Sequence, residues 1–356
     1  MQYLIESQLI LEYTLHRTCV GGNKGIQKDL DDGIDTIGKK MTVCQLYAKQ
    51  IRHRGNVRYN TKNGRKRLMK LLEEDKLGGC PIDSVKLSDA KEWAIRMKEK
   101  GISYKTISND KRSLKAAFYT AIQDDCIRKN PFDFQLNTVI EDDTEPKVPL
   151  TPAQEESFLS FAQNDKVYQK YYDELIILLG TGLRISELCG LTDTDIDFEN
   201  RIINVDHQLL RSAETGYYIE TPKTKSGIRQ IPMSEKVYEA FNRVLKRRRG
   251  AKAVTIDGYS NFLFLNRDGY PKTATNYDGM FRGLAKKYNK YYEEALPKVM
   301  TPHTLRHTFC TNMANAGMNP KALQYIMGHS NITMTLNYYA HATFDSAKAE
   351  MLRIAA

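Results

Sequence analysis

Two separated stretches of the sequence place charged and titratable side chains close together. His303 and Arg306 are three residues apart, so on a helix they would share one face. Arg184 follows a Thr-Gly pair at a predicted helix start, and Glu187 is spaced to orient its guanidinium. An arginine is always charged, and its planar fork fits two phosphate oxygens. The pattern indicates phosphate chemistry, although an isolated arginine is more often a structural ion-pair residue.

Two weaker clusters contain further groups that can transfer protons or attack phosphorus. Lys223 and Lys225 lie in a predicted turn between two strands, where lysines are usually only solvated. His329 is followed by the adjacent tyrosines Tyr338 and Tyr339. Each of these residues alone would be an ordinary core or surface residue. These residues indicate chemistry only because they occur together with Arg184 and Arg306.

The composition permits two globular domains that interact with a polyanion. The chain has 356 residues and a net charge of +10, from 53 Lys plus Arg against 43 Asp plus Glu. A positive field of this kind attracts nucleic acid, although many basic soluble proteins share it. The six cysteines show no spacing typical of zinc ligands, which predicts reduced thiols and no metal. They are Cys19, Cys44, Cys80, Cys126, Cys189 and Cys310.

The sequence gives no indication of export or membrane insertion. No apolar run approaches the roughly 20 residues of a membrane span. The first residues lack a charged segment followed by a hydrophobic signal core. We therefore expect a protein that stays in the cytoplasm and does not contact the membrane.

The elements that must position these residues begin with a helical domain at 41–141. Residues 1–40 read as a tether with at most one helix. Helical periodicity then predicts a bundle of four or five helices, with N-caps at Ser88 and Ser103 and a stop at Asn130-Pro131. The bundle carries cations that we expect on its surface: Lys62, Arg65, Lys66, Arg67, Lys105, Lys111 and Arg112.

An acidic, proline-bearing stretch at 142–149 is the predicted linker, and 150–356 is the predicted second domain. Its helices are expected to start at Thr151-Pro152, Ser234, Thr301-Pro302 and Asn319-Pro320. Three strand-like segments lie between them, at 202–205, 217–220 and 229–231. The fold class that follows is mainly α with a small β-sheet. A short amphipathic helix at 344–354 is expected to dock on a neighbouring subunit.

Together the four clusters resemble the motifs of the tyrosine recombinase family, in particular integrases of phages and of conjugative transposons of Gram-positive bacteria. The Thr-Gly-Leu-Arg-x-x-Glu-Leu motif corresponds to Thr181–Leu188, and the family's hairpin lysine motif corresponds to Lys223–Pro232. His-x-x-Arg begins at His303, and Leu-Gly-His-Ser matches Gly328–Ser330. The resemblance covers about residues 42–356 and implies a helical core-binding domain and a catalytic domain that clamp DNA.

The resemblance implies a set of catalytic residues and no cofactor or metal. The residues that match are Arg184, Lys223, His303, Arg306, His329 and Tyr338. Lys225 is a rival for the lysine role. For the nucleophile, the family's nine-residue spacing from the Gly-His histidine favours Tyr338, whereas its Tyr-x-His signature favours Tyr339. Adjacent helical positions diverge by about 100°, so only one tyrosine can face the phosphate.

The implied reaction is cutting and rejoining of DNA through a 3′-phosphotyrosine. His303 would be the base, the arginines and His329 would bind phosphate oxygens, and Lys223 would protonate the 5′ oxygen. The implied partners are double-stranded DNA, three more copies of the chain in a tetramer on DNA, and an excisionase or host DNA-bending protein. Relatives from transposons usually carry an additional arm-binding domain. Residues 1–40 would be a remnant of it, or the chain would act on core sites alone.

Two other functions fit part of this pattern. The first is a catalytically silent DNA-binding regulator of the same fold, which would form no covalent adduct. The second is a type IB topoisomerase, which would relax plasmids that lack a recombination site. The presence of every catalytic residue type argues against the regulator, and the Gly-His-Ser motif argues against the topoisomerase.

Overall fold

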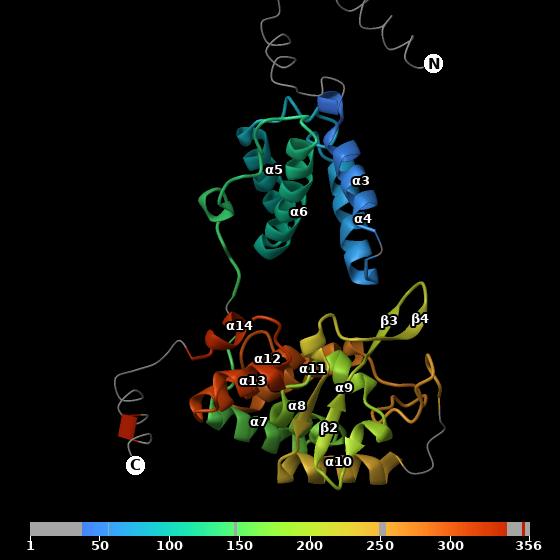
Figure 1. Ribbon diagram of the computed structural model, residues 1–356. Coiled ribbons are helices and arrows are strands. Elements are labelled where there is room, and N and C mark those ends of the chain that lie inside the picture. The colour runs from blue at the N-terminus through green and yellow to red at the C-terminus, as the bar shows by residue number, and fades with distance from the viewer. Residues whose placement is uncertain (1–37, 56, 146–147, 249–253, 340–350, 353–356) are drawn as a thin grey trace, which may run out of the picture. The chain divides into compact units, whose positions relative to one another are not determined.

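The computed structural model describes residues 38–55, 57–145, 148–248, 254–339 and 351–352. The chain divides into two compact units, Met1–Glu145 and Pro146–Ala356 (Figure 1). Helices dominate both units and the strands are few and short, which confirms the predicted fold class. The predicted N-terminal tether, up to residue 37, and the predicted helix at 344–354, apart from 351–352, lie outside the described residues.

Within the described residues of the first unit, four α-helices and two short 3-10 helices make up most of the chain. They are α3 (Val43–His53), α4 (Tyr59–Glu73), α5 (Leu87–Glu99), α6 (Tyr104–Gln123), η1 (Gly38–Lys40) and η2 (Leu136–Thr138). Their core is aromatic: the rings of Trp93 and Phe118 pack on Phe132 with centroid distances of 5.7 and 5.4 Å. The four helices agree with the predicted bundle.

Two predicted helix boundaries in this unit are wrong. Helix α5 begins at Leu87, one residue before Ser88, because the Asp89 carboxylate accepts the Lys86 backbone N–H at 2.8 Å and caps the helix there. Helix α6 begins after Ser103 as predicted but ends at Gln123. The chain then turns at Asp125, which has a positive φ of 54°. Asn130 instead fastens the following segment by donating to the Lys115 carbonyl at 2.8 Å.

The described residues of the second unit contain further helices, and α8 packs between α10 and α12 (Figure 1). The helices are α7 (Pro152–Asn164), α8 (Tyr172–Thr181), α9 (Ile185–Gly190), α10 (Glu235–Arg248), α11 (Ala274–Tyr291), α12 (Pro302–Asn315), α13 (Pro320–Met327) and α14 (Thr333–Leu336), with η3 (Gln169–Tyr171), η4 (Asp193–Asp195) and η5 (Lys225–Gly227). Thr151, Thr301 and Asn319 cap α7, α12 and α13 as predicted. These caps fix where the site-bearing helices start.

Two small antiparallel sheets complete the described part of the second unit. One has the order β1-β2-β5, with β1 (Ile196–Asp197), β2 (Ile202–Val205) and β5 (Arg229–Pro232), and the other pairs β3 (Gln208–Ser212) with β4 (Gly216–Glu220). The register places Ile203 opposite Ile231 in the first sheet and Leu209 opposite Ile219 in the second. The strands β2, β4 and β5 confirm the three predicted segments.

The segment that carries Lys223 and Lys225, residues 221–228, is called the lysine segment, and it does not form a hairpin turn. Strand β4 pairs with β3, and β5 pairs with β2, so the residues between β4 and β5 cross from one sheet to the other. Neither β1 nor β3 was predicted. The first has two residues, and the second does not alternate strictly between buried and exposed positions, so both lack the pattern of a half-buried strand.

Candidate active site

Arg184 lies at the turn between α8 and α9. Gly182 ends α8 with a φ of 63°, a left-handed conformation that favours glycine. The Arg184 backbone N–H donates to Glu187 at 2.8 Å, and its guanidinium donates to the other carboxylate oxygen at 2.6 Å. A further guanidinium nitrogen donates to the Gly328 carbonyl at 3.0 Å. Glu187 thus orients Arg184, as predicted. The Gly328-His329 segment is in direct contact with Arg184.

Glu187 also binds Arg229, a residue for which the sequence suggested no role. Both side chains are almost fully buried. Two terminal nitrogens of Arg229 donate to the two oxygens of Glu187 at 2.9 and 3.1 Å. Burial alone would raise the pKa of Glu187, but the hydrogen bonds and charge of Arg229, with the charges of Arg184 and Arg306, lower it to about 2. Glu187 is therefore a carboxylate at every physiological pH.

Arg306 is buried beside this pair, on the second turn of α12. Its guanidinium donates to the carbonyl of Gly182 at 2.5 Å and to that of Met327. Burial and the neighbouring charge of Arg184 lower its pKa to about 9, so it still carries its charge at pH 7. Three guanidinium groups therefore surround one carboxylate. The excess of positive charge favours an anion such as a phosphate.

The two predicted site histidines differ in their surroundings. His303 is exposed on the first turn of α12, one turn before Arg306. His329 is 6% exposed, and its Nδ1 is 3.0 Å from the Thr335 hydroxyl. Burial and the charges of Arg306 and Arg184 lower the pKa of His329 to about 4. His329 is therefore neutral at pH 7 and acts as a hydrogen-bonding group rather than as a cation.

The two candidate nucleophiles follow α14 and are held differently. The Tyr338 ring packs edge-on against His307, with a centroid distance of 4.8 Å. Burial and the Cys310 thiol raise the pKa of Tyr338, while the charge of Arg306 lowers it. The Tyr339 hydroxyl instead donates to the Met318 carbonyl at 2.5 Å. Tyr338 is thus within the electrostatic influence of Arg306, whereas the hydroxyl of Tyr339 is bound to the backbone.

Lys223 and Lys225 are both exposed in the segment that joins β4 to β5. Arg229 holds this segment by donating to the Gly227 carbonyl at 3.0 Å. The segment also packs against Gly328: a Cβ on that glycine would lie 3.0 Å from the Ser226 carbonyl oxygen. The four sequence clusters are therefore joined directly by side-chain and backbone contacts.

Arg229 and Thr335 are the residues that the sequence analysis missed. Arg229 lies two residues before the buried Ile231, so both point to the same face of β5. A charged residue on the buried face of a strand signals an internal ion pair, and this pattern would have identified it. Thr335 is fully buried in a short helix and carries no comparable signal in the sequence.

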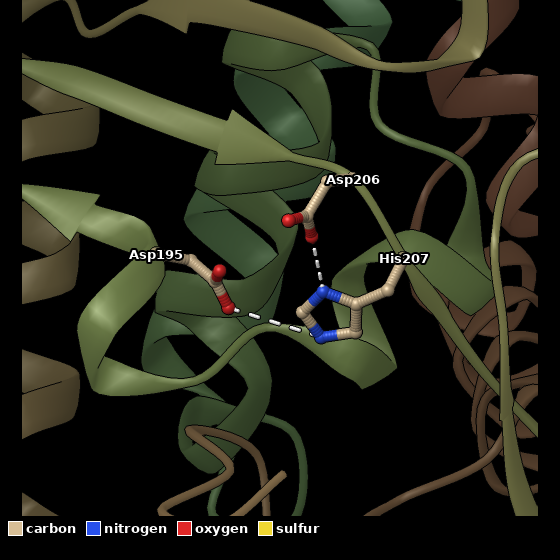
Figure 2. A group of neighbouring side chains, drawn as sticks. All are labelled: Asp195, Asp206 and His207. Atoms are coloured by element: carbon tan, nitrogen blue, oxygen red, sulfur yellow. Dashed lines mark hydrogen bonds and ion pairs between the residues drawn. The ribbon is translucent and has the colours of Figure 1, made fainter. Parts of the chain in front are cut away.

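A separate group of Asp195, Asp206 and His207 has the residue types of a metal site. Figure 2 shows the two carboxylates directed at different ring nitrogens of His207. Nδ1 bonds to Asp206 at 2.5 Å, and Nε2 bonds to the Gly190 carbonyl at 2.8 Å. Both nitrogens thus already have acceptors as partners, which makes the ring a poor metal ligand. The cysteines Cys44, Cys80, Cys126, Cys189 and Cys310 are free thiols.

The described helices include none that is both long enough and apolar enough to cross a membrane. This finding is consistent with the mean hydropathy of −0.53.

Comparisons with known proteins identify the family. A model described as the phage integrase family matches residues 149–346. The transposase of transposon Tn916 from Enterococcus faecalis is 69% identical over 329 residues, 92% of this chain and 81% of that protein. A solved Tn1549 transposon integrase, with one arginine changed to lysine and in complex with a circular intermediate DNA, is 78% identical with a TM-score of 0.84, covering 88% of this chain and 99% of that one.

A second structure of the Tn1549 integrase, with one tyrosine changed to phenylalanine, is in complex with transposon right end DNA. It is also 78% identical with a TM-score of 0.84 and covers 89% of this chain and all of that one. These likenesses confirm the resemblance that the four motifs indicated. The chain belongs to the phage integrase family.

Proposed function

We propose that this chain excises and integrates a mobile DNA element by cutting and rejoining strands through a 3′-phosphotyrosine. Membership of the phage integrase family and the 69% identity to a transposon transposase confirm the predicted enzyme class, a tyrosine site-specific recombinase. The observation that carries the assignment of its site is the cluster of three arginines around Glu187, beside His329 and Tyr338. The proposed catalytic residues are Arg184, Lys223, His303, Arg306, His329 and Tyr338.

Tyr338 is the proposed nucleophile, with Tyr339 as a structural residue. The hydroxyl of Tyr339 is engaged by the Met318 carbonyl, while Tyr338 lies within the influence of Arg306. A second argument comes from the two Tn1549 integrase structures. Their substituted arginine and tyrosine are 154 residues apart, and Arg184 and Tyr338 are likewise 154 apart. This equal spacing matches Tyr338 and does not match its neighbour Tyr339.

The chemistry follows from the charges around the site. A neutral phenol is a weak nucleophile, so its proton must be accepted as its oxygen bonds to phosphorus, and His303 is the proposed acceptor. Arg184 and Arg306 bind the non-bridging oxygens, whose negative charge grows in the pentavalent transition state. The neutral ring of His329 donates a hydrogen bond to one of them. The fixed carbonyl partners of both arginines keep these donors oriented before DNA arrives.

Lys223 is the proposed acid that protonates the departing 5′ oxygen, with Lys225 as the alternative. Both are exposed in a segment held by Arg229, so either can approach a leaving group. The phosphotyrosine bond retains the energy of the broken ester. A 5′ hydroxyl of a partner strand can therefore attack it, release Tyr338 and rejoin the DNA without ATP.

The chain acts on DNA, and we propose that both units contribute to binding. In the first unit, Lys111, Arg112 and Lys115 line a cavity of about 500 Å³ between α6 and η2. Phosphate contacts of this kind make the binding of DNA weaken steeply as the salt concentration rises.

A tetramer on DNA and an excisionase or host DNA-bending protein are the further proposed partners. Residues 41–141, 142–149 and 150–356 are the proposed core-binding domain, linker and catalytic domain.

The experiment that tests this function uses nicked suicide duplexes built from the ends of the element that flanks the gene. The wild type and the Tyr339→Phe variant should form a covalent protein–DNA species on denaturing gels, and Tyr338→Phe should form none. If Tyr339→Phe alone abolishes the species, the assignment of the nucleophile is wrong. Specific binding without any covalent species would support the regulator, and relaxation of plasmids without such ends would support the topoisomerase.

A further inference from the structure

Thr335 touches both His329 and Tyr338 through separate atoms. It lies in α14, which packs against α13 (Figure 1). Its exposed fraction is 0%. Its hydroxyl is 3.0 Å from Nδ1 of His329. Its backbone carbonyl accepts the N–H of Tyr338, also at 3.0 Å. One buried residue therefore links a phosphate-binding histidine to the proposed nucleophile.

The contact with His329 matters because a neutral imidazole carries its proton on only one nitrogen. The ring is neutral at pH 7, since burial and the surrounding charges of Arg306, Arg184, Arg229 and His303 disfavour its charged form. Nδ1 is occupied by Thr335, which leaves Nε2 for the substrate. A phosphate oxygen can only accept a hydrogen bond, so Nε2 must hold the proton and Nδ1 must accept one.

We propose that Thr335 is a positioning residue: its hydroxyl donates to Nδ1 of His329, holds the Nε2–H tautomer that the phosphate requires, and its carbonyl sets the starting position of Tyr338. This inference rests on the proposed roles of His329 and Tyr338. It concerns a residue that touches neither DNA nor the reacting atoms, so its effect passes through the two residues it holds.

Because α14 is short, Thr335 lies only three residues before Tyr338. The helix has four residues, and Tyr338 follows it by two. The backbone N–H of Thr335 is itself bonded to the Ile332 carbonyl at 2.8 Å, which fixes Thr335 in the turn. A change at Thr335 is therefore transmitted to the histidine through the side chain and to the tyrosine through the backbone, by different bonds.

The tautomer can be measured in the full-length protein without DNA. Long-range ¹H–¹⁵N spectra at pH 7 distinguish a protonated Nε2 from a protonated Nδ1, and the His329→Gln variant assigns the signal. We expect a protonated Nε2 and an Nδ1 shift typical of a hydrogen-bond acceptor. A protonated Nδ1 in the wild type would overturn the proposal, whatever the DNA-cleaving activity is.

Three variants then test the consequence for cleavage. Thr335→Val keeps the shape but removes the hydroxyl, and we expect covalent adduct formation to slow about tenfold, the effect of losing one buried hydrogen bond. Its His329 signal should change to a mixture of tautomers, which a purely structural role would not cause. Thr335→Ser retains the hydroxyl and should restore the wild-type tautomer and most of the rate. Thr333→Val alters an exposed threonine of the same helix and should change neither.

These outcomes separate the inference from the proposed function. If the wild type forms an adduct that depends on Tyr338 and Thr335→Val forms it equally fast with an unchanged tautomer, the role of Thr335 is refuted and the function stands. If the wild type forms no such adduct, the proposed function fails, and the tautomer spectra still decide the contact between Thr335 and His329. If Thr335→Val does not fold, the wild-type and Thr335→Ser spectra decide it.

Discussion

The carboxylate of Glu187 accepts hydrogen bonds from two terminal nitrogens of Arg229, at 2.9 and 3.1 Å, in the interior of the second unit. The same carboxylate bonds to Arg184. Arg229 also donates to the carbonyls of Gly227 and Ile326, which belong to the lysine segment and to α13. The ion pair therefore joins the turn before α9, the lysine segment and α13, and the charge of Arg306 on α12 also acts on Glu187.

Removing Arg229 should destabilise the protein strongly. In Arg229→Met, Glu187 keeps a buried charge with one partner fewer, and we expect a loss of about 3–5 kcal/mol in the free energy of unfolding. Arg229→Lys keeps the charge but cannot reproduce the two-pronged contact, so it should lose less. Urea unfolding measures both. Arg267→Met, at a side chain that is 94% exposed, is the control and should change little. A loss below about 1 kcal/mol in Arg229→Met would contradict this account.

Stability should fall on mild acidification because of His329. Its pKa is about 4 in the folded protein against 6.5 as its ordinary value, so the unfolded chain binds the extra proton first. The contribution of the neutral ring to stability is complete above about pH 6.5 and is lost as the pH falls towards 4, about 3 kcal/mol in total. Unfolding by urea at pH 7, 6, 5 and 4 should show a shallower dependence in His329→Gln. The exposed His53→Gln should retain the wild-type slope.

Glu187 should make the stability depend on pH only below about pH 4.5. Its pKa is about 2 in the folded protein against an ordinary value of 4.5. A depressed carboxyl pKa contributes stability above the unfolded value and loses it as the pH falls through the folded one. The window is therefore from about pH 4.5 to 2, below that of His329. In Glu187→Gln, the stability lost between these pH values should decrease relative to the wild type. An unchanged dependence would mean that Glu187 is not held as a buried carboxylate.

Arg184→Lys should separate catalysis from binding. Lysine keeps the positive charge but lacks the fork that grips two oxygens in the transition state. We expect covalent adduct formation on suicide duplexes to fall about 100-fold, with DNA affinity nearly unchanged. Gel shifts measure the affinity, and Arg201→Lys, at an exposed arginine paired with Glu235, is the control. Equal losses in affinity and cleavage would indicate a binding role alone.

Gly328→Ala should damage the site through a specific contact. Gly328 has a φ of 59°, and an added Cβ would lie 3.0 Å from the Ser226 oxygen and 3.1 Å from a terminal nitrogen of Arg229. Gly317 is a matched control, because it has a φ of 78° and nothing within 4 Å of an added Cβ. Both alanines should carry the backbone cost of about 1–2 kcal/mol. Only Gly328→Ala should also slow cleavage, since it displaces the lysine segment and His329.

The sequence by itself determined the family, the fold class and most helix starts. Those features depend on local patterns. Thr151-Pro152 and Thr301-Pro302 each mark a helix start within four neighbouring residues, and each catalytic motif is a contiguous stretch. It failed where a local pattern had a stronger competitor. The Asp89 carboxylate accepts the Lys86 backbone N–H, so α5 begins before Ser88. The chain leaves α6 and turns at Asp125, which has a positive φ, before it reaches Asn130-Pro131.

Only the tertiary structure decided how the site is held and what distinguishes its tyrosines. Two partners of Arg229, Glu187 and Ile326, are 42 and 97 residues away in the sequence, and the Tyr339 hydroxyl bonds to a carbonyl 21 residues earlier. A local pattern can show that Arg229 is buried, but it does not show which residues are its partners, because these contacts arise when separate helices and strands pack together. The pKa of His329 has the same origin: arginines from three different elements surround one buried ring, and no single segment of the chain contains that arrangement.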